Sequence, residues 1–498
     1  MTIDIDAPYK SRIREALSDS GVRKAVDRAM GQLAQRRERA LDAIDNDTMR
    51  DEAREIREHA VRNLPALLVE LETNLIRNGC EVHWARTGDE ANDILKEIAR
   101  TRKVKTAIKS KSMVTEEIHL NTSLEEIGVK VVETDLGEYI IQLANEPPSH
   151  IVAPVIHKRV EEISELFQNE LGMEPTLDPS IMCDAARKEL RKHFLAADMG
   201  ISGCNFAIAE TGTVCIITNE GNGRMVSSLP PVHVVVAGIE KIVPKVEDAI
   251  LLWQATTRNA TGQDASVYFS MTSGPKKSDH ADGPKEVHVI LVDNARTNVM
   301  EKGYADALMC IRCGACMDVC PVYREIGGHA YGRTAYPGPI GSILTPLMNE
   351  NIDIGKDLPF ASSLCGACKD ACPVKIDLPR LLLELRNDLS KEKITSPFQR
   401  FLVKSFAWIL KRPKRYLIAT KIAGLTQKFS VRSTQTFSNL PSPFNHWTKS
   451  RVLQKPSSKT FKEIWKNSSA DLPVWNTPSP EWKDRGFIND DENQESNR

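Results

Sequence analysis

Hydrophobic positions return at helical spacing over the first sixty residues of the chain. Charged residues separate these positions, which within residues 10–63 include Ile13, Leu17, Val26, Met30, Leu33, Leu41 and Ile44. Such spacing places apolar side chains on one face of a helix. It predicts one or two amphipathic helices that pack on the next domain or on a partner chain. We delimit this N-terminal helical segment as residues 1–63.

From about residue 64 the pattern alternates between strand-like and helical periods. Short β-rich runs at 80–85, 104–108 and 129–133 are separated by helical stretches, one capped by Thr87 and one over 115–127. After a longer helical insertion over about 149–200, further β-rich runs follow at 205–209, 214–218, 233–237 and 288–292, and residues 210–213 predict a hairpin turn between the first two of them. Alternating β and α segments with short loops predict a parallel or mixed sheet covered by helices on both faces. We therefore expect an α/β domain over residues 64–298.

Cysteines interrupt this pattern after residue 300. Seven of the chain's 11 cysteines form two runs, Cys310-x2-Cys313-x2-Cys316-x3-Cys320-Pro321 and Cys365-x2-Cys368-x3-Cys372-Pro373. The first run has the spacing of bacterial ferredoxins that bind cubane iron–sulfur clusters. Zinc sites also take thiolates, but they usually bring two ligand pairs separated by a longer spacer. The spacing predicts a mostly α-helical, ferredoxin-type module with two clusters over residues 299–385.

The same spacing assigns each cysteine to a cluster. In proteins with two such clusters, the fourth cysteine of a run binds the other cluster. The rule gives cluster 1 to Cys310, Cys313, Cys316 and Cys372, and cluster 2 to Cys320, Cys365 and Cys368. Where a full second run would have its first cysteine, this chain has Ser362. Cluster 2 is then a [4Fe–4S] cluster with a non-cysteine fourth ligand, which we favour, a [3Fe–4S] cluster, or a cluster completed by a partner chain or solvent.

Other candidate sites in the α/β domain have weaker signals. The basic, hydroxyl-rich loop 109–112 follows a predicted strand, where ligands bind in open α/β sheets, but a solvated loop with a helix cap explains it equally well. Residues 219–224 contain a G-x-G without the third glycine of a dinucleotide site, and no clear helix is predicted after them. His233 and His288 begin apolar strands and are expected to be core histidines. We predict no catalytic residue, and we expect buried free thiols at Cys80, Cys183, Cys204 and Cys215.

Residues 386–498 are predicted to form C-terminal helices and an extended tail. Over 398–425 aromatic and aliphatic residues alternate with Lys and Arg, and Pro413 would divide two helices. This pair either covers the cluster module or lies on a membrane surface. From about residue 430 the chain is rich in Ser, Thr, Asn and Pro, which favours an extended or weakly ordered tail.

Length and charge narrow the functional class. A chain of 498 residues is expected to form two or three domains. Its 66 basic residues nearly cancel 67 acidic ones, so no global field selects nucleic acid. We find no uninterrupted apolar run of roughly 18 to 20 residues that could span a bilayer, and no secretory signal. We therefore expect at most peripheral contact with a membrane. Clustered cysteines in an unsecreted chain favour metal binding in the cytoplasm.

Four segments, at 203–225, 286–296, 310–323 and 362–379, give the chain a family resemblance. It resembles the lactate utilization protein B family, iron–sulfur proteins with a LUD domain. The resemblance implies an α/β fold akin to sugar-phosphate isomerases and CoA transferases, and it implies the same cysteine assignment for two clusters. It also implies a three-part system that oxidises L-lactate to pyruvate, with a second LUD-domain subunit and a cysteine-rich-domain subunit as partners.

The leading expectation is therefore a non-catalytic, iron–sulfur electron-transfer subunit of an L-lactate dehydrogenase complex, needed for L-lactate degradation. A second reading makes the chain a catalytic LUD-domain oxidoreductase, which turnover by the isolated protein would favour. A third makes the clusters structural staples of an assembly scaffold, which clusters without redox activity would favour.

Overall fold

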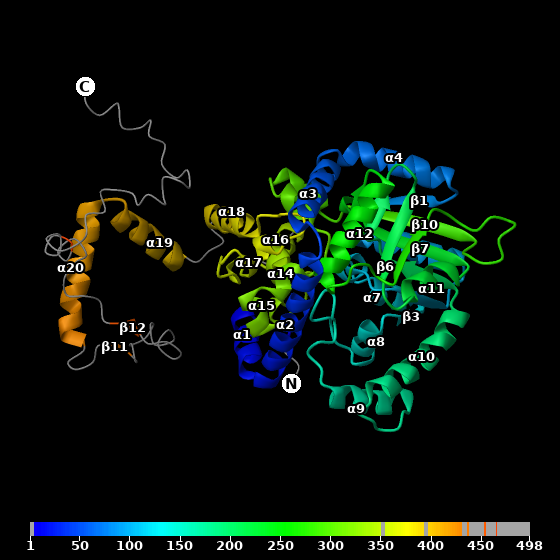
Figure 1. Ribbon diagram of the computed structural model, residues 1–498, viewed down its shortest axis with the longest axis horizontal. Coiled ribbons are helices and arrows are strands. Elements are labelled where there is room, and N and C mark those ends of the chain that lie inside the picture. The colour runs from blue at the N-terminus through cyan, green and yellow to red at the C-terminus, as the bar shows by residue number, and fades with distance from the viewer. Residues whose placement is uncertain are drawn as a thin grey trace. The chain divides into compact units, whose positions relative to one another are not determined.

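The chain divides into two compact units, which we describe separately. The computed structural model describes residues 4–349, 354–392 and 397–430, together with 436–437, 453–454 and 465. The first unit comprises Met1–Ile394 and the second Thr395–Arg498 (Figure 1). All the predicted cluster ligands lie in the first unit.

A six-stranded parallel sheet forms the centre of the α/β domain, with the strand order β1-β10-β7-β4-β2-β3. The strands are β1 (Glu81–Ala85), β2 (Thr106–Lys109), β3 (Lys130–Glu133), β4 (Met199–Ser202), β7 (Val232–Gly238) and β10 (Glu286–Val292). β7 is buried along its whole length, as a central strand covered on both faces must be. The predicted parallel α/β sheet is confirmed.

Helices cover both faces of this sheet. One face packs against α5 (Gly88–Thr101), α6 (Met113–Glu117) and α7 (Leu120–Glu125). The other packs against α4 (Leu64–Arg77), α8 (Leu136–Leu143), α9 (Val160–Leu171) and α10 (Pro179–Ala196). The single helix predicted over 115–127 is two short helices, because His119 between them adopts a left-handed backbone with φ of 53°.

A second sheet of four strands, in the order β8-β5-β6-β9, lies beside the first. It contains β5 (Phe206–Ile208), β6 (Thr213–Thr218), β8 (Ile242–Val243) and β9 (Tyr268–Thr272), and β5 and β6 form the predicted hairpin. The sequence alone did not indicate that these strands form a sheet of their own, apart from the parallel one. The expectation of no clear helix after residues 219–224 is also wrong, since α11 (Asn222–Ser228) begins there. Helix α12 (Val246–Ala260) follows β8.

The cluster module, residues 299–385, consists of short helices and turns, as predicted. It includes α14 (Ala315–Asp318), α15 (Pro321–Ile326), α16 (Gly338–Met348), α17 (Ala367–Asp370) and the start of α18 (Leu378–Lys391), with 3-10 turns at Ala305–Met309, His329–Tyr331 and Leu358–Phe360. Helix α13 (Arg296–Glu301) leads into it, and a further 3-10 turn, Ile239–Lys241, lies in the α/β domain. Helix α18 crosses the domain boundary that we predict at 385/386, and its buried leucines lie in the same core as α16.

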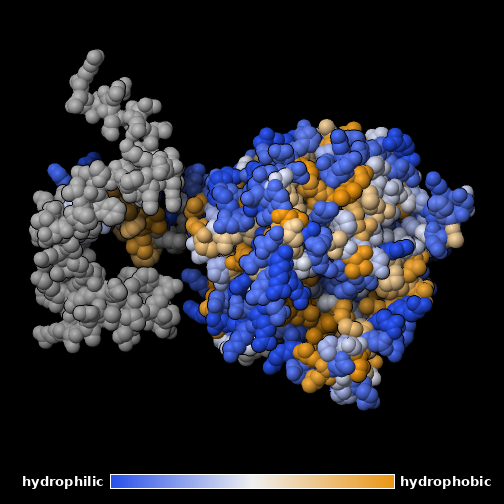
Figure 2. Space-filling model, viewed as in Figure 1, coloured by the Kyte–Doolittle hydropathy of each residue, from blue (hydrophilic) through white to orange (hydrophobic). Residues whose placement is uncertain are grey.

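Three N-terminal helices pack along the cluster module, α1 (Tyr9–Ser18), α2 (Ser20–Asp42) and α3 (Asn46–Arg62). Figure 1 shows α1 and α2 in blue beside the yellow-green helices α14 and α15. Their outward faces are mainly hydrophilic, as Figure 2 shows over α2 and α3. The predicted amphipathic segment therefore packs within its own chain.

Arginines on α2 and α3 hold the backbone next to the cysteines. Arg37 Nη2 donates to the carbonyl of Ala371 at 2.9 Å, and Arg50 Nε donates to the carbonyl of Cys372 at 3.1 Å. Arg57 is buried, and it donates to carbonyls in the α/β domain and in the cluster module, those of Glu240, Ile242, Leu308 and Met309. The N-terminal helices thus tie the two parts of the unit together.

Replacing Arg57 by methionine should destabilise the first unit. The substitution keeps much of the buried volume but leaves four carbonyls without their charged donor, so we expect a loss of about 3 kcal/mol or more. Thermal unfolding of the cluster-loaded protein measures it. Arg62→Met is the control, because Arg62 is an exposed arginine of the same helix. Equal melting temperatures for the two variants would contradict the prediction.

The second unit contains a helix pair, α19 (Pro397–Leu410) and α20 (Pro413–Ser430), and a short antiparallel pair, β11 (Thr436–Phe437) and β12 (Leu453–Gln454). Pro413 begins α20, as predicted. Large apolar side chains of the pair are exposed, including Phe401, Phe406 and Trp408. Among the described residues, no helix combines the length and apolar character needed to cross a membrane. Most of the predicted extended tail after residue 430 lies outside the described residues.

Candidate functional site

Four cysteines from distant parts of the sequence line one small cavity. Cys310, Cys313 and Cys316 come from the loop before α14 and its first turn, and Cys372 follows α17. The rest of the lining is largely aliphatic, with Ile151, Ile311, Ile340, Val374, Ile376 and Leu378. This is the set that the sequence assigns to cluster 1, and the structure brings it together. Four soft sulfur donors around an apolar hollow fit a cubane iron–sulfur cluster.

Backbone N–H groups point at these sulfurs. The N–H of Arg312 donates to Cys310 Sγ and that of Ile376 donates to Cys372 Sγ, each at 3.4 Å. Burial raises the pKa of Cys372 to about 11, although the N–H of Ile376 opposes the shift. The thiol of Cys372 is therefore protonated when no metal is bound, and cluster binding must release its proton.

The second group contains Cys320, Cys365 and Cys368. Burial and the neighbouring Cys320 and Cys365 together raise the pKa of Cys368 to about 12, so the three thiols lie close together. Cys365 is exposed, and the backbone N–H of Ala367 and the side chain of Ser363 lower its pKa. The two groups adjoin, since Cys368 is also among the thiols that raise the pKa of Cys316. Their assignment as ligands stays a prediction.

The two cysteine motifs share one local geometry. Gly314 and Gly366, with φ of 84° and 91°, follow Cys313 and Cys365 and precede helices of four residues. The residue before each of these cysteines, Arg312 or Leu364, also has a positive φ, of 62° or 56°.

Ser362 occupies the position that Cys310 has in the first motif. The N–H of Leu364 donates to Ser362 Oγ at 3.1 Å, as the N–H of Arg312 donates to Cys310 Sγ. The serine oxygen therefore lies where the first motif presents a sulfur.

A buried charge network joins the α/β domain to the cluster 1 loop. Arg296 forms ion pairs with Glu240 and Glu117, and Glu117 Oε2 accepts a hydrogen bond from the hydroxyl of Tyr336. Arg312 Nη2 lies 3.5 Å from Glu240 Oε1, and its guanidinium stacks over the ring of Tyr336 at 4.4 Å. The sequence analysis did not identify these residues. The position of Arg312 between two predicted ligands could have marked it as a residue of the site.

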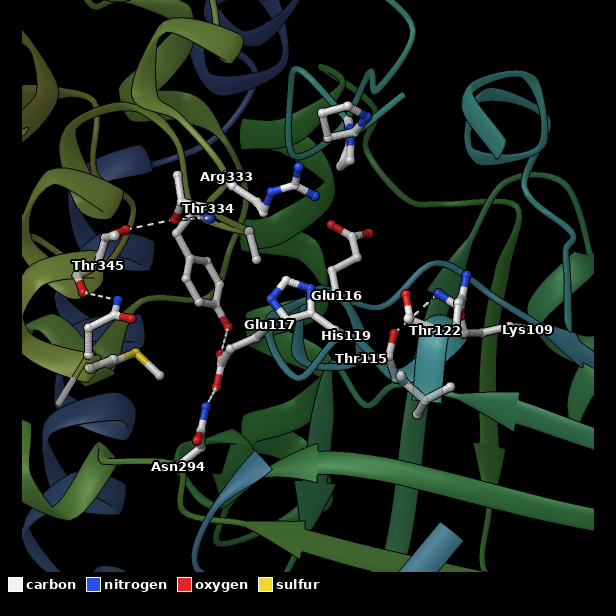
Figure 3. Close-up of a pocket in the computed structure, with 18 residues that line it drawn as sticks. Lys109, Thr115, Glu116, Glu117, His119, Thr122, Asn294, Arg333, Thr334 and Thr345 are labelled. Carbon is white, nitrogen blue, oxygen red and sulfur yellow. Dashed lines mark hydrogen bonds between the residues drawn. The ribbon is translucent and has the colours of Figure 1, made fainter. Parts of the chain in front are cut away.

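The basic loop 109–112 is buried rather than solvated. Lys109 Nζ lies 2.8 Å from Glu133 Oε1, and Lys111 Nζ lies 3.0 Å from Glu138 Oε1. Ser112 caps α6, as expected. Burial raises the pKa of the nearby Glu116 to about 8. Lys109 and Glu116 line a cavity of about 290 Å³ (Figure 3). In this cavity the side chain of Asn294 donates a hydrogen bond to Glu117. Both lysines are thus already paired with acids.

Most other candidates behave as core residues. His233 Nε2 lies 2.9 Å from Ser202 Oγ, and burial lowers the pKa of this histidine to about 4, which confirms a neutral core histidine. His288 is buried, and its Nδ1 lies 3.2 Å from His83 Nε2. Cys80 and Cys215 are buried, as expected, whereas Cys204 is half-buried and Cys183 is exposed. The expectation is wrong for Cys183, because it lies on the outward face of α10.

Family models match three successive parts of the chain. They are a LUD domain over residues 68–292, a 4Fe-4S dicluster domain over 306–376, and the C-terminal part of lactate utilisation protein B over 387–470. They confirm the predicted order of a LUD-type α/β domain and a ferredoxin-type module.

Similar proteins cover nearly the whole chain. Lactate utilization protein B of Shouchella clausii is 42% identical over 93% of this chain and 97% of its own. That of an Exiguobacterium strain is 43% identical over 94% and 98%. An uncharacterized electron transport protein of Escherichia coli, YkgF, is 39% identical over 93% and 97%. A solved DUF162 family protein from Deinococcus radiodurans is 15% identical, and the match covers 46% of this chain and 98% of that protein with a TM-score of 0.27. The chain belongs to the lactate utilization protein B family.

Proposed function

We propose that this protein is the iron–sulfur electron-transfer subunit of a system that oxidises L-lactate to pyruvate. The observation that carries the proposal is the pair of adjoining cysteine groups, one buried and one reaching the surface. Cys313 and Cys372 lie in the core, whereas Cys365 is exposed. Iron–sulfur clusters supply one-electron transfer at potentials set by charge, hydrogen bonds and burial.

The two cysteine groups, which are the ends of the proposed relay, have different surroundings. The loop of the cluster 1 group contacts the LUD domain, where Arg312 pairs with Glu240. The cluster 2 group offers Cys365 to a partner surface. We propose that electrons pass between these ends and that the partners are a second LUD-domain subunit and a cysteine-rich-domain subunit. Unoxidised thiolate ligands require a reducing compartment, which supports a cytoplasmic location.

We further propose that both clusters are of the [4Fe–4S] type and that Ser362 Oγ completes cluster 2. The support is positional: Ser362 accepts the same backbone hydrogen bond that Cys310 accepts in the first motif. An oxygen ligand is uncommon at iron–sulfur clusters, but a serine oxygen can take the place of a cysteine sulfur on one iron. In this proposal Cys320, Cys365, Cys368 and Ser362 hold cluster 2.

Reduction by L-lactate tests the proposed function. We expect the anaerobically purified, cluster-loaded protein to be reduced by L-lactate only when both partner subunits are present. Visible absorbance and electron paramagnetic resonance (EPR) follow the reduction. Pyruvate formation by the isolated protein would instead favour a catalytic LUD domain. Clusters that stay redox-silent in the complete system would favour a scaffold.

A further inference from the structure

A second cavity of the LUD domain, of about 330 Å³, reaches the loop of cluster 1. It lies where β2 and β4 of the parallel sheet end, since residues 110–112 and 203–205 line it. Ligands of open α/β sheets bind at these carboxyl ends of strands. Arg312, between two predicted ligands of cluster 1, lines the same cavity. Lys111 lines it too but is paired with Glu138. The other two cations of the lining are Arg312 and Lys241, which comes from the turn after β7.

Both of these cations have donors without partners. The side chain of Arg312 is only 7% exposed, and its Nη1 is buried with no hydrogen-bond acceptor. Lys241 is 7% exposed, and within the described part of the chain its ammonium has neither a hydrogen bond nor an ion pair. The two lie close together, because after burial the charge of Arg312 is the main cause that lowers the pKa of Lys241, to about 8. Glu240 offsets part of this positive charge, since it pairs with Arg312 and raises the pKa of Lys241. The unpaired Nη1 of Arg312 and the unpaired ammonium of Lys241 still favour an anion between them.

A hydroxyl elsewhere in the cavity is also unsatisfied. Thr218 Oγ1, at the end of β6, is buried and has no hydrogen-bond partner. The lining near it is polar and uncharged, with Asn205 and Asn219. Asp135 and Glu220 also line the cavity. Burial raises the pKa of both carboxyl groups, which disfavours a negative charge on these two side chains. The cavity therefore combines a cationic end with a hydrogen-bonding wall.

We propose that this cavity binds a small organic carboxylate. Its carboxylate group lies between Lys241 and Arg312, and its remaining oxygen atoms face Thr218. Charge neutralisation of cluster 1 explains the two cations, but it explains neither the cavity nor the unsatisfied threonine. The inference goes beyond the proposed function, because the binding does not depend on whether the clusters carry electrons.

Calorimetric titration of the full-length, cluster-loaded protein with L-lactate, pyruvate and inorganic phosphate tests this site. We expect one of the two carboxylates to bind. Lys241→Met should weaken that binding about tenfold or more, since a charge-assisted hydrogen bond is lost. Thr218→Val removes a neutral hydrogen bond with little change of shape, so it should weaken binding by roughly two- to tenfold. Lys302→Met is the matched control, because Lys302 is exposed after α13, and it should leave the affinity unchanged.

Three results would overturn the proposal. The first is no binding of either carboxylate by the unaltered protein. The second is binding that Lys241→Met and Thr218→Val leave unchanged. The third is tighter binding of phosphate than of either carboxylate. Iron content and EPR spectra show whether Lys241→Met keeps cluster 1. Where it does not, Thr218→Val decides, because Thr218 is not in the cysteine module.

Discussion

Replacing Cys372 by alanine should remove cluster 1, although Cys372 belongs to the second cysteine motif. The cavity that holds Cys310, Cys313 and Cys316 is closed by Cys372, so the change takes away the fourth sulfur of that set. Replacing Cys320, in the first motif, should instead remove cluster 2. With two clusters of four irons each, either variant should lose about half of the bound iron.

Iron and sulfide quantification together with EPR of the reduced protein distinguishes the two variants. We expect each to retain a different one of the two cluster signals. Cys368→Ala should behave as Cys320→Ala does, because both belong to the cluster 2 group. Cys183→Ala is the control, since Cys183 is an exposed thiol on α10. The reciprocal assignment is wrong if Cys372→Ala and Cys368→Ala lose the same signal, or if Cys368→Ala loses none.

The elements that were predictable from the sequence are those with a local cause. Val234, Val235 and Val236 lie in a continuous apolar run, which predicts a buried strand whatever its neighbours are. Cys310 and Cys372 could be paired across 61 residues because cluster chemistry restricts which sulfurs meet. The hairpin at Thr211–Gly212 followed from turn residues between two β-rich runs.

The elements that were missed depend on distant contacts. Arg57 resembles any charged residue of an amphipathic helix, and only the fold brings it to the carbonyls of Ile242 and Met309. The second sheet was hidden for the same reason, since strand pairing, not strand propensity, separates β5 and β6 from the parallel sheet. A histidine in the sequence does not indicate a positive φ as a glycine would, yet the positive φ of His119 divides the predicted helix in two.

The charge network explains why the LUD domain and the cluster module act as one unit. Arg296 and Arg312 both bind Glu240, one from the helix after β10 and the other from the cluster 1 loop. Burial raises the pKa of Glu240, but the positive charges of Arg296, Lys241 and Arg312 outweigh this effect and lower the pKa to about 2. A carboxylate that stays charged at all physiological pH values can hold the loop in place whatever the state of the cluster. The same loop presents Arg312 to the proposed carboxylate site.

Replacing Ser362 should change the type or the potential of cluster 2 without affecting cluster 1. Ser362→Ala removes the oxygen that the N–H of Leu364 holds in the turn, so one iron loses its protein ligand. We expect this variant to lose that iron on mild oxidation and to give the EPR signal of an oxidised [3Fe–4S] cluster. Ser362→Cys restores the full ferredoxin motif and should keep four irons. Its midpoint potential should rise, because a soft thiolate stabilises ferrous iron better than a harder oxygen ligand does.

Ser363→Ala is the matched control for these variants, because Ser363 is the next residue and its hydroxyl contacts Cys365 rather than occupying the turn position. It should keep a [4Fe–4S] cluster 2. EPR-monitored redox titration of the three variants and the unaltered protein measures both cluster type and potential. If Ser362→Ala keeps the cluster type and potential of the unaltered protein, the fourth ligand comes from solvent or a partner chain. A partner chain that supplies this ligand must then reach the iron beside the exposed Cys365.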